Sequence, residues 1–400
     1  MKHGLSQKRS AALIFSLLFC FALVSVPAVT LWRPKETRSY YENRNLAPIP
    51  DLSWEATANG SYFEDLEGYF CDHAALRTTV LKLSARTDLN LLRRPVVNDV
   101  VIDGDLLLAR EPYETVDSQA AAVLAGQAAD RLSQLSQLVE SWGGSFLYVA
   151  VPSHYAYFED RYPAYLNNRA EYTAAANQAF FSALDQRHVP YLDVGRLWER
   201  EGRPEEYMSS VDHHWTLTGC LSAYRQIMDC LNERSGLGLT VLGDADLVLN
   251  TLPNPYLGSH ARKLCGQWKS AEQLSFAELL EPIPFTRRND GQEAAPVLFA
   301  FPSGQWAEID YTFYMGGDIS ETILDTDRPE LPSILIYGDS YTNLMETLLY
   351  ASFDETRSLD LRYCDAMSLL EYTEQYRPEV VLCIRDYEQL LNLTGNGNIS

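Results

Sequence analysis

The stretch Ser333–Tyr341 reads SILIYGDSY, in which a short apolar run leads directly into Gly-Asp-Ser. Such a run predicts a buried strand of a parallel sheet, and the residues Tyr341–Tyr350 predict a helix after it. Ser340 is therefore expected at the carboxyl end of a strand and beside a helix N-terminus, where open α/β sheets bind ligands. Free backbone N–H groups and the helix dipole there favour the negative charge of acyl transfer. Ser340 is a candidate nucleophile, and an ordinary helix N-cap is the competing interpretation.

Helical and apolar segments alternate on both sides of this stretch. Amphipathic helices are predicted at Ser118–Glu140 and Ala170–Asp185, and short buried strands at Phe146–Val151, Val189–Val194, Ile334–Tyr337, Leu359–Arg362 and Val380–Ile384. Such alternation predicts an α/β fold with helices on the faces of the sheet.

The character of the sequence changes along the chain and predicts four segments. They are an N-terminus with a membrane anchor at 1–35, the first part of the α/β domain at 36–235, a β-rich insertion at 236–330 and the second part of the domain at 331–400. The first part contains an extended linker at Tyr40–Trp54, a helical stretch at Tyr62–Leu92 and a hairpin within Val96–Leu108. In the insertion, Val297–Phe301 and Tyr311–Tyr314 are β-like pieces.

The N-terminal segment predicts the location of the protein. Ala11–Trp32 holds 22 residues without a charge, and five basic residues and no acidic one occur in residues 1–35. As a helix this run is roughly 33 Å long, against about 30 Å for the hydrocarbon core of a bilayer. The basic start holds the N-terminus in the cytoplasm and directs residues 36–400 outside. A cleaved signal peptide ending near Val26–Ala28 is the alternative, and it gives the same extracytoplasmic location.

Composition argues against two kinds of partner. The chain has 54 acidic and 32 basic residues, a net charge of −22, so it lacks the concentrated positive charge that binds nucleic acid. Its seven cysteines are scattered without CxxC spacing and indicate no zinc site.

A second motif, VDHHWTLT at Val211–Thr218, precedes an apolar helix. Asp212 and His214 are two residues apart, so both side chains can project to one side of an extended segment, where the carboxylate fixes the imidazole tautomer. With Ser340 they would complete a Ser-His-Asp triad. The alternatives are a loop in which Asp212 or Thr216 caps the helix, and a metal site formed by Asp212, His213 and His214.

The string Asp212-His213-His214-Trp215 is the signature of the DHHW family, which the chain resembles over most of its length after the anchor. Further matching pieces are Glu42–Pro48, Tyr256–Gly258, Tyr311–Gly317, Gly338–Tyr341 and Asp360–Tyr363. DHHW proteins are similar to alginate O-acetyltransferase proteins, which in turn resemble SGNH hydrolases with the motif order permuted, so that the serine comes last. The resemblance implies an SGNH hydrolase-like fold, with an open, mostly parallel sheet.

The resemblance also implies the roles of the site residues. Ser340 would be the nucleophile, His214 the general base and Asp212 the carboxylate that orients it. The Tyr341 N–H is the first candidate donor to an oxyanion, and the Asn343 side chain is the second.

The implied function is an extracytoplasmic acyltransferase that moves an acetyl group onto a cell-surface or secreted polysaccharide, without a metal or organic cofactor. A polytopic membrane acyltransferase is the implied acyl donor. The alternatives are a carbohydrate esterase of the same fold and a non-catalytic envelope scaffold or glycan-binding protein.

Overall fold

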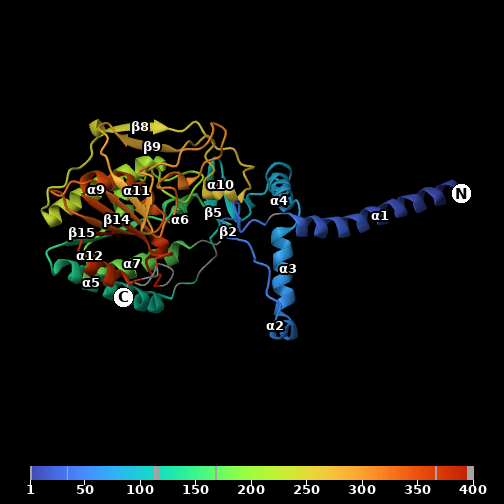
Figure 1. Cartoon of the computed structure of the whole chain (residues 1–400), viewed down its shortest axis with the longest axis horizontal. Coiled ribbons are helices and arrows are strands. Elements are labelled where there is room, and N and C mark those ends of the chain that lie inside the picture. The colour runs from blue at the N-terminus through green and yellow to red at the C-terminus, as the bar shows by residue number, and fades with distance from the viewer. Residues whose placement is uncertain are drawn as a thin grey trace. The chain divides into compact units, whose positions relative to one another are not determined.

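A computed structural model describes residues 2–33, 35–111, 115, 117–166, 169–364 and 367–393 of the chain (Figure 1). Met1, Pro34 and the end of the predicted last segment, 394–400, lie outside these residues. The chain divides into two compact units. The smaller consists of Met1–Asn98 with Ala261–Lys269, and the larger of Asp99–His260 with Ser270–Ser400.

The smaller unit begins with the long helix α1, Lys2–Trp32. Its part Ala12–Trp32 is long and apolar enough to cross a membrane, which suits either a single-pass anchor or a signal sequence. The further elements are the short strands β1 (Arg38–Ser39), β2 (Arg44–Asn45) and β3 (Val96–Val97), the helices α2 (Trp54–Asn59), α3 (Ser61–His73) and α4 (Arg77–Arg86), and a π-helical turn at Thr87–Leu91. The predicted helix over Tyr62–Leu92 is thus interrupted after His73, where Leu76 takes a left-handed backbone conformation with φ of 66°.

Ion pairs connect the β1–β2 hairpin with the helices that follow it. Arg44 pairs with Asp72 of α3, and Arg77 of α4 pairs with Glu42 in the hairpin turn. The predicted linker at Tyr40–Trp54 therefore begins as part of a folded hairpin.

The larger unit is built on one eight-stranded sheet with the order β11-β10-β12-β14-β13-β15-β6-β7. The strands are β6 (Ser145–Val151), β7 (Tyr191–Asp193), β10 (Thr286–Asn289), β11 (Gln292–Ala294), β12 (Glu321–Asp325), β13 (Ile334–Gly338), β14 (Glu355–Asp360) and β15 (Val380–Asp386). From β14 to β7 neighbouring strands are parallel, whereas β10, β11 and β12 form an antiparallel edge.

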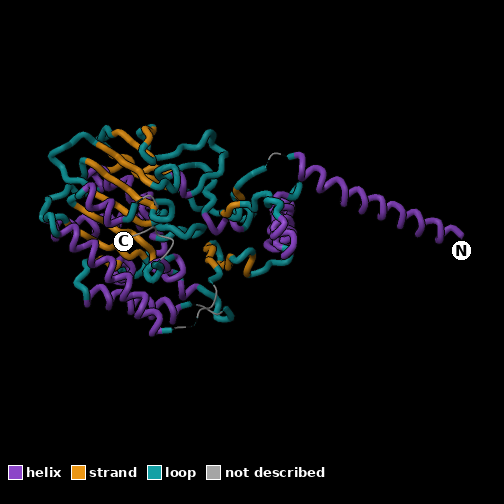
Figure 2. Tube along the Cα trace, turned by 60° about the horizontal axis from the view of Figure 1, so that its bottom comes forward, coloured by secondary structure: helices purple, strands orange, loops and turns teal. Residues whose placement is uncertain are grey.

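Helices cover both faces of this sheet (Figures 1 and 2). The helices α5 (Ser118–Glu140), α7 (Ala170–Gln186) and α12 (Leu369–Tyr376) pack on one face, and α9 (Leu217–Ser235) and α11 (Tyr341–Leu349) on the other. The strands read as near-continuous apolar runs because both of their faces are buried. The remaining elements of the unit are β4 (Val100–Asp103), β5 (Leu106–Ala109), α6 (His154–Tyr157), α8 (Val194–Arg200), β8 (Leu247–Thr251) and β9 (Ser275–Leu279), and α10 (Ser259–Lys263) continues into the smaller unit.

The predicted fold class is confirmed: the sheet is open, mostly parallel and flanked by helices. The hairpin predicted around Asp103–Asp105 is formed by β4 and β5. In the predicted insertion, β8 pairs with β9, and β10 to β12 extend the main sheet.

Two local predictions were wrong, and a third was right only in part. Tyr311–Phe313 is a 3₁₀ turn because the Asp310 side chain accepts the Thr312 N–H at its start, and in Val297–Phe301 only Phe299 forms a β-bridge. The strand predicted at Leu359–Arg362 is confirmed in part: β14 includes Leu359 and ends at Asp360, whose carboxylate accepts hydrogen bonds from the backbone N–H and the side chain of Arg362.

The carboxyl end of β13 is a point where the chain reverses its winding. The next strand, β14, pairs on one side of β13, and the strand after it, β15, pairs on the other. The connecting helices correspondingly lie on opposite faces, α11 with α9 and α12 with α5 and α7. In open α/β sheets ligands bind outside the strand ends at such a switch point.

Candidate active site

Ser340 follows β13 at this switch point. The strand can end so close to its neighbour because residue 338 is glycine: a Cβ there would lie 2.1 Å from the carbonyl oxygen of Ile384. Ser340 occupies the N-cap position of α11, but its side chain makes no capping hydrogen bond. Its Oγ instead lies 2.8 Å from Nε2 of His214. The Ser340 hydroxyl group therefore contacts a base and does not act as the side-chain cap of α11.

The segment that carries Asp212 and His214 is a tight loop closed at its base. Met208 and Trp215 form an antiparallel bridge, and the Ser209 N–H donates to the carbonyl of His214 at 3.1 Å. The helix α9 that follows is capped by Thr216, whose side chain accepts the Gly219 N–H. Asp212 is thus not the N-cap of α9, and its carboxylate can accept hydrogen bonds from other residues.

Asp212, His214 and Ser340 form one hydrogen-bonded chain. Nδ1 of His214 lies 3.0 Å from Oδ1 of Asp212, and Nε2 lies 2.8 Å from Oγ of Ser340. An ionised carboxylate only accepts, so Nδ1 carries the imidazole proton and Nε2 accepts from the serine hydroxyl. This is the tautomer that a general base requires.

The carboxylate of Asp212 is buried and receives several further donors. The Tyr256 hydroxyl donates to Oδ2 at 2.8 Å, and Oδ1 accepts from the Ser259 hydroxyl at 2.8 Å and from the His213 backbone N–H at 2.6 Å. Burial by itself raises the pKa of Asp212, but His214 and the hydrogen bonds from both histidines outweigh it and hold the pKa well below its usual value. Asp212 is therefore a fixed anion that orients His214.

A glycine allows the second loop to supply these hydroxyl groups. A Cβ at Gly258 would lie 2.4 Å from the carbonyl oxygen of Val211, so only glycine permits this approach of the two loops. Tyr256 and Ser259, on either side of Gly258, are thereby brought to Asp212.

The imidazole of His214 is held between two rings. The Tyr311 ring lies parallel to it at a centroid distance of 3.6 Å, and the His213 ring at 3.8 Å with a tilt of 37°. Two rings so close to a third must lie on its opposite faces. Burial, followed by the neighbouring His213, lowers the pKa of His214 to about 4. His214 is therefore neutral, and able to accept a proton, at physiological pH.

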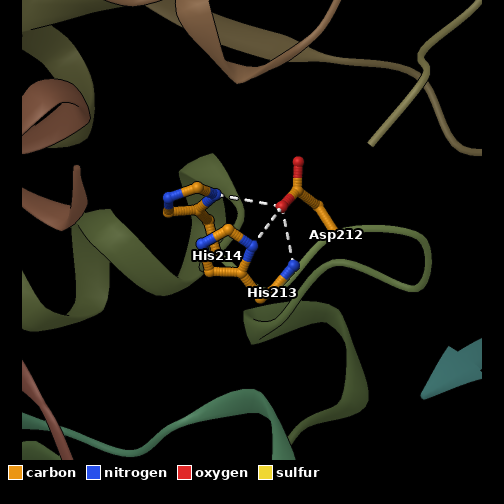
Figure 3. A group of neighbouring side chains, drawn as sticks. All are labelled: Asp212, His213 and His214. Carbon is orange, nitrogen blue, oxygen red and sulfur yellow. Dashed lines mark hydrogen bonds and ion pairs between the residues drawn. The ribbon is translucent and has the colours of Figure 1, made fainter. Parts of the chain in front are cut away.

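Asp212, His213 and His214 also lie close enough to share a metal ion. Figure 3 shows that both imidazoles turn one nitrogen toward the same oxygen of Asp212. These nitrogens carry protons that are donated to oxygen acceptors, and a metal ion would have to displace them. The facing atoms thus fit a hydrogen-bonded triad.

The two predicted oxyanion donors lie at the start of α11, and both are buried. The Tyr341 N–H already donates to Oδ1 of Asp339 at 3.0 Å. The Asn343 side chain makes only a long contact, 3.4 Å, with Oδ1 of Asp318. An oxyanion would have to replace Asp339 at the Tyr341 N–H and the weaker contact with Asp318 at Asn343, and both groups stay candidate donors.

Three residues that contact the triad were not predicted as site residues from the sequence: Tyr256, Ser259 and Tyr311. Tyr256 and Tyr311 lie in pieces that carried the family resemblance, and that resemblance was the available signal. Their roles depend on contacts between residues far apart in the sequence: Tyr256 is 44 residues and Ser259 is 47 residues from Asp212.

A serine, a histidine and an aspartate form one hydrogen-bonded chain at the carboxyl edge of an open α/β sheet, with the serine last in sequence, and the fold is SGNH hydrolase-like. Residues 104–289, which include Asp212 and His214, match the family model described as "SGNH hydrolase-like domain, acetyltransferase AlgX". The match supports chemistry of the acetyltransferase or esterase type.

Solved structures with the same fold include PatB1 of Bacillus cereus with a sulfonyl adduct and a DHHW family protein of Eubacterium siraeum. The first has a TM-score of 0.62 and 17% identity, over 75% of this chain and 97% of that one. The second has a TM-score of 0.56 and 17% identity, over 76% and 97%. No curated protein matches the sequence significantly. The resemblance drawn from the motifs is confirmed by these matches.

Proposed function

We propose that this protein is an extracytoplasmic acyltransferase that O-acetylates a polysaccharide, with Ser340 as nucleophile, His214 as general base and Asp212 as the residue that orients the base. The hydrogen-bonded chain from Asp212 through His214 to Ser340 carries the proposal. A serine hydroxyl needs an adjacent base to become a nucleophile, and His214 is neutral and in contact with it.

In the first half of the reaction, Oγ of Ser340 attacks the carbonyl carbon of an acetyl ester and gives its proton to Nε2 of His214. The tetrahedral intermediate collapses, the leaving alcohol takes the proton from His214, and acetyl-Ser340 remains. In the second half an acceptor hydroxyl attacks the acetyl group and gives its proton to His214. Ser340 leaves with that proton, and the acetylated acceptor is released.

The helix α1 supports the proposed location. The uncharged part of α1, Ala12–Trp32, has basic residues on both sides, a pattern that favours a single-pass anchor with residues 36–400 outside the membrane. An enzyme in that position has no direct access to cytoplasmic acyl donors. We therefore propose that a polytopic membrane acyltransferase delivers the acetyl group and that a surface or secreted polysaccharide receives it.

The test uses the full chain in detergent, a chromogenic acetyl ester, and an oligosaccharide acceptor that is either present or omitted. We expect acetylation of the peptide that contains Ser340, detected by mass spectrometry, and an acetylated oligosaccharide when the acceptor is present. The matched variants are Ser340→Ala and Ser133→Ala, the latter on the exposed side of α5.

Each outcome decides between the alternatives. Acetate release by acetyl-Ser340 without an acetylated oligosaccharide would assign an esterase. If the Ser340 peptide stays unmodified and Ser340→Ala behaves like Ser133→Ala, the protein is not an enzyme of this kind, and a scaffold or glycan-binding role would take the place of the proposal.

A further inference from the structure

His213 presents a second imidazole at the site, and its two nitrogens have different surroundings. Nδ1 lies 2.8 Å from Oγ of Ser259, and that hydroxyl donates its single proton to Oδ1 of Asp212 at 2.8 Å. Ser259 must therefore accept from Nδ1 of His213, so in the tautomer with a single ring proton that proton is on Nδ1. It follows that Nε2 of His213 has no proton and is a hydrogen-bond acceptor.

The accepting nitrogen of His213 lies on the accessible side of the ring. The side chain is 43% exposed, compared with 5% for His214, and among the described residues no hydrogen bond reaches its Nε2. In Figure 3 the two rings lie side by side, and each turns its second nitrogen away from Asp212 in the same direction. In His214 that second nitrogen is the one that contacts Ser340.

The site thus presents two acceptor nitrogens next to each other, one in the triad and one beside it. The ring centroids are 3.8 Å apart and the ring planes are tilted by 37°, so the two rings are in contact and their second nitrogens are neighbours. Hydroxyl groups on two neighbouring carbon atoms can reach both nitrogens, each with an ordinary hydrogen bond. An isolated hydroxyl group on the acceptor has one proton and can satisfy only one of them.

We propose that His213 is a specificity-determining residue that accepts a hydrogen bond from a second hydroxyl group of the acceptor, so that the enzyme transfers the acetyl group to vicinal diols. This inference rests on the proposed function and names its acceptor class. The hydroxyl bound by His214 attacks acetyl-Ser340, while its neighbour is held by Nε2 of His213. A site built to receive a hydroxyl discriminates against the analogue that lacks it, because the bond is then lost.

The experiment measures what fraction of acetyl-Ser340 reacts with an acceptor and what fraction is hydrolysed by water. The full chain in detergent is acetylated by the chromogenic ester in the presence of trans-cyclohexane-1,2-diol or of its monomethyl ether, which lacks the second hydroxyl proton. The measured quantity is the ratio of acetylated acceptor to free acetate. Since both products arise from one intermediate, a change in the rate of acylation does not alter the ratio.

For the unmodified protein we expect the ratio to be about tenfold higher with the diol than with its ether, the effect of one hydrogen bond. In His213→Asn, whose amide retains the donor to Ser259 but lacks an atom at Nε2, the two ratios should agree within about twofold. In His213→Gln the amide oxygen reaches the position of Nε2, and part of the preference should return.

Equal ratios for diol and ether in the unmodified protein would overturn the inference, and so would a preference that survives in His213→Asn. The first comparison needs no variant and decides the question even if the variants fold poorly. Failure of the proposed function is recognised separately, because the Ser340 peptide would then carry no acetyl group.

Discussion

The imidazole of His214 lies flat on the phenol ring of Tyr311, with centroids 3.6 Å apart and planes inclined by only 4°. Tyr311 in turn accepts a hydrogen bond from Nε1 of the buried Trp215, which fixes the ring. In the proposed reaction His214 takes a proton from Ser340, and its positive charge would develop over the face of an aromatic ring, which favours the cation. The contact therefore both positions the base and stabilises its charged form.

Removal of this ring should slow acylation. We expect Tyr311→Leu to lower kcat/KM for the chromogenic ester about tenfold, because the stacking and cation–π contacts are lost. Tyr311→Phe keeps the ring and should retain most activity, at a stability cost of about 1 kcal/mol for the unpaired Trp215 N–H. Equal kcat/KM values for the two variants would show that the stacked ring does not assist the base.

The three triad residues should act as one unit. Ser340→Ala and His214→Ala should each lower acetyl transfer by at least about 10³-fold, and Asp212→Asn by the same factor or less. The double variant Ser340→Ala/His214→Ala should be no worse than either single variant. Circular dichroism and thermal unfolding provide the control, since Ser340→Ala should change the free energy of unfolding by no more than about 1.5 kcal/mol, the value of one hydrogen bond. Additive losses in the double variant would argue against a common mechanism.

The pH dependence follows from the lowered pKa of His214, about 4 against an ordinary value of 6.5. His214 is a base only when neutral, so kcat/KM should rise as the pH increases through about 4 and stay level from pH 5 to 7. His213→Asn removes a neighbour that lowers this pKa, and the acid limb should move toward neutral pH. If kcat/KM in the unmodified protein instead rose with a midpoint near pH 6.5, the lowered pKa of His214 would be contradicted.

The same pKa affects stability. Between pH 6.5 and 4 the unfolded chain binds a proton at His214 that the folded chain does not bind, so the free energy of unfolding should fall as the pH decreases through this range. Urea unfolding of the unmodified protein and of His214→Gln at pH 7 and pH 5 measures the effect. The variant should lose less stability than the unmodified protein over this interval.

Tyr256 should stabilise the buried carboxylate. Tyr256→Phe removes the hydroxyl that donates to Oδ2 of Asp212, and we expect a loss of about 1.5–3 kcal/mol in the free energy of unfolding, measured in urea. Tyr165→Phe is the matched control, since Tyr165 is 66% exposed. A Tyr256→Phe variant as stable as this control would show that the hydrogen bond contributes little.

The sequence by itself determined the order of the main elements and the kind of chemistry. Apolar runs such as Phe146–Val151 predict buried strands through their own composition, and the confirmed α/β fold follows from their alternation with helices. Asp212 and His214 are two residues apart, so their pairing is a local property that the motif predicts.

Only the tertiary structure decided how the site is completed. Ser340 and His214 are 126 residues apart, and their contact exists because β13 ends at a switch point beside the loop before α9. Tyr256, Ser259 and Tyr311 come from the segment predicted as an insertion, in turns whose positions depend on close backbone contacts such as that at Gly258. No periodicity in the sequence encodes such contacts, because they are made between loops and are set by the packing of distant elements.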